Sequence, residues 1–436
     1  MRLRVFQSGA GDCVLLTANT GENMLIDGGF RGTYRDHVRP SIAIGPGMQK
    51  LDLVCVSHID SDHISGILQL LDDTLEWRVF NHQQSIPDPA NVSPPTFAEP
   101  PPIEEIWYNG FRDTVDDVTA IENMLLFNMR SLGTVESLED QALHMQFLAT
   151  GVKQGLELTA RISPEQLGIP LNPDFDGGLM MAMDPVAART FGSVQLSLIG
   201  PFAEDLDQLR DDWNVWVGDN RRTIKKLHRE AEEDQARLRV EEGKTLIDLL
   251  SRIALAGQER GPVSVPNLAS IVLLAEEGGN SILLTGDARD VEILEGLDVA
   301  GKLDANGRIH LSVLKLQHHG SINNVDQAFC KAVTADTYVV CGVSGGNHKN
   351  PDKKVLDYIL DSRLSTGRHR STHPSATNPF TIVFSSNEHD GTASTNDHMS
   401  DLRAHVENRA AAANANAHVV DVRFLPQGGS FIDIQV

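Results

Sequence analysis

Short apolar runs separated by glycine-rich or polar turns recur along the chain, a pattern typical of β-strands. Amphipathic spacing of Ile64, Ile67, Leu68 and Leu71 predicts a helix directly after one of these runs. Strands outnumber the helices between them in the first part of the chain, and polar clusters end several of them. The predicted strands cover residues 2–6, 13–17, 24–26, 51–56, 106–108, 194–199, 270–274, 281–285, 311–316, 337–343, 380–384 and 431–436.

Two segments break the strand pattern. Residues 203–260 are rich in Asp, Glu, Arg and Lys with spaced leucines, and they predict a charged helical insertion between two strands. This insertion is either a solvated helix pair or an arm that binds a second copy of the chain or a protein partner. Residues 362–417 are polar, with an alanine- and asparagine-rich end, and they predict a loop-rich surface segment.

Composition limits the class of protein. The 436 residues contain no uncharged apolar stretch of about 18 residues and no apolar core of a signal peptide, so we expect a cytoplasmic protein without a membrane span. The 37 basic and 60 acidic side chains give a formal net charge of −23, which excludes a protein that coats nucleic acid generally. The same charge suits carboxylates that bind divalent cations. Four scattered cysteines show no zinc-type pairing and are expected to be buried thiols.

One cluster offers four potential metal ligands within six residues, at the end of an apolar run. It reads His58-x-Asp60-x-Asp62-His63. A strand-to-helix turn can direct His58 and Asp60 at one point and Asp62 and His63 at a neighbouring one, as two metal ions require. Imidazole and carboxylate together suit Zn²⁺, Mn²⁺ or Fe²⁺. The alternative is a capped helix start with incidental histidines.

Two distant clusters strengthen the metal hypothesis. Asp287 follows the run at 281–285, and His318 and His319 follow the run at 311–316. Adjacent residues of an extended chain point in opposite directions, so one of these histidines is expected to bind metal while the other faces substrate.

In this order, the motifs resemble the metallo-β-lactamase superfamily, and within it the hydrolase domain of the DNA-uptake competence protein ComEC and its soluble relatives. The resemblance implies an α/β fold, a four-layer αβ/βα sandwich formed as one domain by residues 1–436, with the helical insertion within it. The motifs are Gly9-x-Gly11-Asp12, Leu25-Ile26-Asp27-Gly28-Gly29, Ser57-His58-x-Asp60-x-Asp62-His63, Ser270-Ile271-Val272-Leu273-Leu274, Leu283-Leu284-Thr285-Gly286-Asp287 and Leu314-Lys315-x-x-His318-His319-Gly320-Ser321.

The resemblance also implies a metal centre of two divalent ions, Zn or Mn. By position, His58 and Asp60 would serve one ion, Asp62 and His63 the second, and Asp287 would bridge both.

The remaining motif positions imply supporting roles. His319 would be the late histidine ligand and His318 would face substrate, although the two are interchangeable at this point. Asp12 and Asp27 would support ligands or form turns. Lys315 would hold a phosphate, unless it is a surface lysine.

The chain departs from the superfamily pattern in three places. Asp60 stands where the superfamily usually has histidine. No histidine lies between His144 and His228, so the usual middle histidine ligand has no candidate. His348 is displaced from the position of a late Asn…His-Pro motif, and whether it reaches the site stays open.

The implied activity is hydrolysis by a metal-bound hydroxide that Asp62 orients. We expect the substrate to be a phosphodiester of nucleic acid or of a nucleotide-type molecule, and the acidic charge favours a small-molecule or single-stranded substrate. Two alternatives remain. One is hydrolysis of another ester or amide, such as a lactone, a phosphocholine ester or a β-lactam. The other is a non-catalytic scaffold that holds a partner through residues 203–260.

Overall fold

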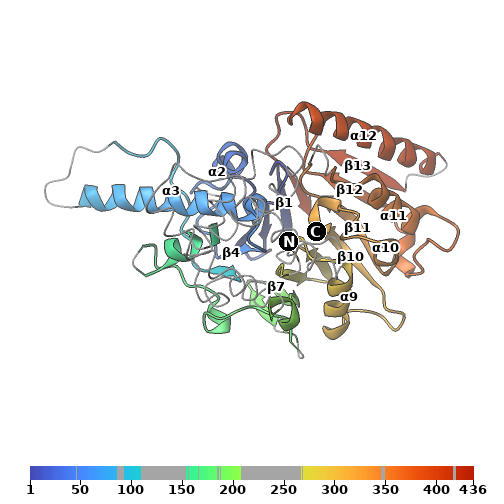
Figure 1. Cartoon of the computed structure of the whole chain (residues 1–436), viewed down its shortest axis with the longest axis horizontal. Coiled ribbons are helices and arrows are strands. Elements are labelled where there is room, and N and C mark those ends of the chain that lie inside the picture. The colour runs from blue at the N-terminus through green and yellow to red at the C-terminus, as the bar shows by residue number, and fades with distance from the viewer. Residues whose placement is uncertain are drawn as a thin grey trace, which may run out of the picture.

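The computed structural model describes residues 1–45, 47–85, 93–109, 154–155, 157–164, 166–183, 186, 188–207, 267, 269–344, 349–415 and 419–436. Two mixed β-sheets form its centre (Figure 1). In the first sheet, the first and last strands of the chain pair antiparallel, which brings both termini to the middle of the molecule. Its order is β14 (Phe431–Gln435), β1 (Arg2–Phe6), β2 (Val14–Thr17), β3 (Asn23–Ile26), β4 (Leu53–Val56) and β5 (Ile106–Tyr108).

The second sheet is antiparallel at one end, from β6 to β9, and parallel from β9 to β13. Its order is β13 (Val420–Phe424), β12 (Phe380–Phe384), β11 (Val333–Val340), β10 (Ile309–Lys315), β9 (Asn280–Leu284), β8 (Val272–Glu277), β7 (Val194–Gly200) and β6 (Ala188–Phe191).

Alternating side chains divide the buried residues of each sheet between two apolar layers. In β4, Leu53 and Cys55 join a cluster shared by both sheets, whereas Val54 and Val56 join the cluster on the opposite face. The shared cluster also takes Val339 from β11. The period of two along a strand therefore places the two sheets face to face.

Helices cover the outer face of each sheet. The first sheet is covered by the π-helix η1 (Tyr34–Val38), α2 (Arg39–Ile42) and α3 (Ser61–Ser85), and the short α1 (Arg31–Thr33) contacts α3 and η1. The second is covered by α9 (Asp290–Val299), α10 (Gln327–Ala332), α11 (Lys353–Leu364) and α12 (Ala393–Ala413). Short 3₁₀ turns are η4 (Pro173–Phe175), η6 (Gln317–Gly320) and η7 (Pro374–Thr377).

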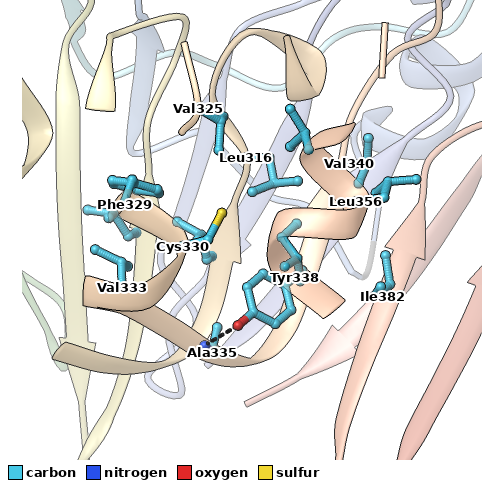
Figure 2. Packing of buried hydrophobic residues seen from close by; sticks show 14 of the residues in the cluster. Leu316, Val325, Phe329, Cys330, Val333, Ala335, Tyr338, Val340, Leu356 and Ile382 are labelled. Atoms are coloured by element: carbon cyan, nitrogen blue, oxygen red, sulfur yellow. Dashed lines mark hydrogen bonds between the residues drawn. The ribbon is translucent and has the colours of Figure 1, made fainter. Parts of the chain in front are cut away.

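The packing under α10 illustrates the outer layer of the second sheet. Phe329 and Cys330 of α10 lie against Val333 and Tyr338 of β11, with Leu356 of α11 beside them (Figure 2). The Tyr338 hydroxyl accepts a hydrogen bond from the backbone N–H of Ala335 at 3.1 Å. The layers are therefore helices, sheet, sheet and helices, which confirms the expected αβ/βα sandwich.

The expectation of a loop-rich segment over residues 362–417 is wrong for residues 393–413, which form α12. Met399, Leu402, Val406 and Ala410 are buried at intervals of three and four residues, so one narrow apolar face packs on the second sheet. The rest of this helix is mostly polar or alanine, so the average composition of the segment did not indicate an apolar helix face.

Three earlier expectations lie largely or wholly outside the described residues. The charged insertion at 203–260 is described only at residues 203–207, which are helical. A partner or a second copy that binds through it therefore stays a prediction. His348 also lies outside the described residues. Among the described helices, none has both the length and the hydropathy to cross a membrane.

Candidate metal centre

Three strand ends place the predicted site residues at one edge of the sandwich. His58, Asp60, Asp62 and His63 follow β4 in the first sheet. Asp287 follows β9 in the second sheet, and the His318–His319 pair follows the neighbouring parallel strand β10. Because strands fix the backbone up to these ends, short turns suffice to bring ligands from both sheets together.

The turn into α3 separates the first cluster into two pairs. The backbone carbonyl of Asp60 accepts hydrogen bonds from the N–H groups of His63 and Ile64 at 2.9 and 3.0 Å. His58 and Asp60 therefore precede the helix, whereas Asp62 and His63 occupy its first turn. This is the division that the spacing predicted.

The carboxylate of Asp287 lies at the centre of four imidazoles. Its Oδ2 atom is 3.7 Å from Nε2 of His58 and 3.8 Å from Nε2 of both His318 and His319. Its Oδ1 atom is 3.5 Å from Nε2 of His63. One carboxylate therefore faces the same ring atom of all four of these histidines.

The other two carboxylates flank this arrangement. Oδ2 of Asp62 lies 3.3 Å from Nε2 of His319 and 4.0 Å from Nε2 of His63. Oδ2 of Asp60 lies 3.8 Å from Nε2 of His58. The structure thus brings together the six residues that the sequence predicted as metal ligands, with His318 beside them.

The ring atoms that face the centre are buried and lack hydrogen-bond partners. Nε2 of His58, His63 and His319 and Oδ1 of Asp287 are all in this state among the described residues. Buried polar atoms in proteins are nearly always satisfied, so a group of unsatisfied atoms directed at one point needs an explanation. Two ligands of one tetrahedral Zn²⁺, each about 2.0–2.1 Å from the ion, lie about 3.3 Å apart. The observed separations of 3.3–4.0 Å and the His/Asp donor set fit divalent metal ions.

The opposite ring nitrogen of three histidines is held by an oxygen atom. Nδ1 of His63 donates to Asp27 at 2.9 Å, and Nδ1 of His319 lies 3.1 Å from Oδ1 of Asp12. Nδ1 of His58 lies 3.0 Å from the Ser57 hydroxyl, which itself donates to Asp27. A proton fixed on Nδ1 leaves the lone pair of Nε2 free to bind metal. Asp12 and Asp27 therefore have the supporting position that the motifs implied.

The electrostatics of the centre also favour a cation. Burial, together with the carboxylates of Asp62 and Asp287, raises the pKa of Asp60 to about 7. Burial and the neighbouring His63 lower the pKa of His58 to about 4, which keeps this ring neutral and able to bind metal. Burial alone would lower the pKa of His319, but Asp287 and Asp12 raise it to about 10. The carboxylates thus produce a negative field that a divalent ion would offset.

Lys315 does not have the substrate contact that the sequence implied. Its side chain is buried, its Nζ atom forms an ion pair with Asp12, and it donates to the carbonyl of Gly286 at 2.9 Å. Burial alone would lower the pKa of Lys315, but the Asp12 carboxylate raises it above its ordinary value. The expected phosphate contact is corrected to an internal ion pair that fixes Asp12 beneath His319.

The two adjacent histidines are not extended, which corrects the sequence argument about their directions. His318 and His319 lie in the turn η6 with φ values of 47° and 54°. The N–H of His318 donates to the carbonyl of Gly286, and the carbonyl of His318 accepts from the N–H of Ser321. This tight turn directs both Nε2 atoms at Asp287 instead of at opposite faces.

Sequence reasoning missed two residues of the site. Ser57 supports His58 and contacts Asp27, and its place directly before the ligand cluster was the available signal. Asn324 accepts from His318 and donates to the backbone carbonyl of Asp287 at 2.9 Å, and nothing in its local sequence identifies it.

Comparison with known proteins agrees with this geometry. A profile of the metallo-β-lactamase superfamily matches residues 8–90. The chain is 30% identical to ComE operon protein 3 of Bacillus subtilis (strain 168) over 93 residues, which is 21% of this chain and 11% of that protein.

Two solved structures show weaker similarity. Zn²⁺-bound PqqB from Methylobacterium extorquens is 9% identical with a TM-score of 0.37, over 100% of both chains. A point mutant of the β-hydroxylase CmlA is 9% identical with a TM-score of 0.35, over 99% of this chain and 54% of that one. Both scores are too low to support an argument about fold or activity. The residues that match the superfamily profile, 8–90, include the ligand cluster that follows β4. The match to the superfamily thus covers the segment of this chain that supplies His58, Asp60, Asp62 and His63.

Proposed function

We propose that this protein is a metal-dependent hydrolase that acts on phosphodiester bonds of a small or single-stranded substrate. The observation that carries the proposal is the set of buried, unsatisfied Nε2 atoms of His58, His63 and His319 around Asp287. A folded protein keeps such a costly arrangement when a ligand satisfies it.

The donor set supports two divalent ions, Zn²⁺ or Mn²⁺. His58 and Asp60 would hold one ion, Asp62, His63 and His319 the other, and Asp287 would bridge them. Ions in such a centre lower the pKa of water and offset the charge of an anionic substrate. Without them, the carboxylates of Asp60, Asp62 and Asp287 would repel a phosphate group, so we expect activity to depend strictly on metal.

Asp62 is the residue suited to orient the attacking water. Its carboxylate is 20% exposed, whereas the side chain of Asp287 is 3% exposed, so Asp62 lies nearer to solvent. Burial would raise the pKa of Asp62, but His63 and His319 lower it below its ordinary value. The carboxylate is therefore ionised at neutral pH and can accept a hydrogen bond from water.

The choice of a phosphodiester rests on the similarity of the motifs to the competence-type hydrolase domain. The net charge of −23 further favours a substrate of few phosphates over long duplex nucleic acid. The chain spans about a tenth of the length of the curated relative, so that similarity supports the chemistry of the site and not a shared whole-protein role.

One experiment tests the proposal directly. The purified chain is stripped of metal, reloaded with Zn²⁺ or Mn²⁺, and assayed on bis-p-nitrophenyl phosphate, a short single-stranded DNA, a lactone and a β-lactam. We expect metal-dependent hydrolysis of the two phosphodiesters. Asp287→Asn should reduce it by more than about 100-fold, which exceeds the usual effect of losing a residue that only supports a ligand. The matched control is Asp433→Asn on β14, which changes an ion pair with Arg4 of β1 at the surface.

Each contrary result points to one alternative. Hydrolysis of the lactone or β-lactam but not of the phosphodiesters would assign the site to another ester or amide. A metal-loaded protein inert on all four substrates would favour a non-catalytic scaffold.

A further inference from the structure

Four imidazoles surround Asp287, those of His58, His63, His318 and His319. The motifs assign only three of them to metal. The fourth is His318, which the sequence assigned to substrate. The chain has no histidine between His144 and His228, the stretch in which the superfamily pattern that the motifs resemble usually places a histidine ligand.

His318 is held in the same way as the three buried histidines. Its Nδ1 atom lies 2.8 Å from Oδ1 of Asn324. Its Nε2 atom lies 3.8 Å from Oδ2 of Asp287, the same separation that His319 shows from the same atom. Each imidazole thus has an oxygen on one ring nitrogen and the central carboxylate in front of the other.

The orientation of Asn324 decides which nitrogen of His318 carries the proton. Asn324 is fully buried, and its amide nitrogen donates to the backbone carbonyl of Asp287 at 2.9 Å. A carbonyl cannot donate, so the amide oxygen must be the atom that faces His318. The ring therefore donates through Nδ1, and in the neutral imidazole Nε2 carries the lone pair.

A second amide lies beside the same ring atom. The side-chain nitrogen of Asn267 is 3.3 Å from Nδ1 of His318, and the side-chain oxygen of Asn267 is buried without a partner. Exchanging the two ends of this amide would present its oxygen to Nδ1, which agrees with a proton there.

A lone pair on Nε2 that faces a carboxylate oxygen is electrostatically unfavourable unless a cation lies between them. A residue that donates a hydrogen bond to substrate would instead carry its proton on Nε2. The side chain of His318 is 29% exposed, so this position is at the open side of the centre.

We propose that His318 is itself a metal ligand, which supplies the imidazole that the middle of the chain does not, and that Asn324 is the positioning residue that directs it. This inference rests on the proposed metal dependence but not on the identity of the substrate.

Metal binding by variants at position 318 tests the inference without an activity assay. Metal-free protein is titrated with Zn²⁺ and with Co²⁺, and bound metal is counted after dialysis. We expect His318→Ala to weaken binding of at least one ion by about 10-fold or more and to change the visible Co²⁺ spectrum. His310→Gln, which changes a histidine at the start of β10 that contacts Thr334 and Asp336, should leave both unchanged.

A cysteine variant gives a positive signature that a structural effect cannot imitate. His318→Cys should add a thiolate-to-Co²⁺ charge-transfer band in the near ultraviolet, because only a ligand position places the sulfur on the ion. The four natural cysteines are buried, and the wild-type spectrum provides the baseline. Asn324→Leu should weaken metal binding by about 10–100-fold and shift the Co²⁺ spectrum, with full occupancy restored at high metal concentration.

The outcomes separate the two proposals. Unchanged metal affinity in a folded His318→Ala, with no new band in His318→Cys, would overturn the inference and return His318 to substrate contact. A wild-type protein that binds metal as described but hydrolyses no phosphodiester would overturn the proposed substrate and leave the ligand assignment intact. A wild-type protein that binds no metal would overturn both.

Discussion

Nδ1 of His63 donates to Oδ2 of Asp27 at 2.9 Å, and this bond joins the first turn of α3 to the end of β3. Asp27 has a φ of 57°, and its other oxygen accepts from the N–H of Ser57. One carboxylate therefore fixes the ring orientation of His63 and supports Ser57 next to His58. This relationship shows that the metal centre depends on residues that do not face it.

Asp27→Asn tests that dependence. Asparagine keeps the shape and tolerates the left-handed backbone, but it replaces one of two acceptor oxygens with a donor. We expect the affinity for Zn²⁺ to fall by about 10–100-fold, as measured by competition with a chelating dye. The protein should remain folded by circular dichroism. Equal affinity in the folded variant would show that Asp27 does not orient His63.

The ion pair between Lys315 and Asp12 predicts a large effect on stability. Both side chains are about 4% exposed. Lys315→Met therefore removes the cation that pairs with the buried carboxylate of Asp12. We expect a loss of about 3–5 kcal/mol in the free energy of unfolding, measured with denaturant in the presence of a chelator. The double variant with Asp12→Asn should be destabilised by less than the sum of the single changes. Additive effects would contradict the pair.

The contact between Gly66 of α3 and Gly28 predicts strict intolerance of a side chain. A Cβ atom at Gly66 would lie 1.9 Å from the carbonyl oxygen of Gly28, so α3 would have to move away from the turn that carries Asp27. We expect Gly66→Ala to lower the melting temperature by about 10 °C or more, the effect of several kcal/mol. Gly32→Ala in α1, where a Cβ meets nothing within 4 Å, is the matched control and should be neutral or slightly stabilising. Similar melting temperatures for both variants would refute the close approach.

Asp290 at the start of α9 predicts a pH dependence of folding stability that involves none of the proposed metal ligands. Burial and the carboxylate of Asp326 raise the pKa of Asp290 from 3.8 to about 6. Between these values the folded state binds more protons than the unfolded state, so this group's contribution to stability falls as pH rises from about 4 to about 6. Asp290→Asn removes that penalty and keeps the acceptor for the N–H of Val291.

We therefore expect the free energy of unfolding of Asp290→Asn, relative to that of wild type, to be about 1 kcal/mol higher at pH ~7.5 than at pH ~4. The measurement is denaturant unfolding with a chelator present. Asp298→Asn, an exposed change on the same helix, should show no such difference. A gain that is equal at both pH values would contradict the raised pKa.

The strands and the ligand cluster could be predicted from the sequence because both are local. The apolar side chains of runs such as 51–56 and 281–285 predict strands without reference to the rest of the chain. His58, Asp60, Asp62 and His63 lie within six consecutive residues. The short, mostly polar strand β6 and the narrow apolar face of α12 were missed, because burial of a few side chains by distant elements decided their structure.

The supporting contacts of the centre could not be predicted in this way. Asp12 and His319 are 307 residues apart, and only the packing of the two sheets brings them to hydrogen-bond distance. The same packing buries Lys315, which was expected at a phosphate or at the surface. It also places Asn324 beside His318, which nothing in the local sequence indicated. The sequence by itself determined which residues have the chemistry to bind metal. The tertiary structure decided which nitrogen of each ring faces the centre, because that choice depends on an oxygen atom supplied by a different part of the chain.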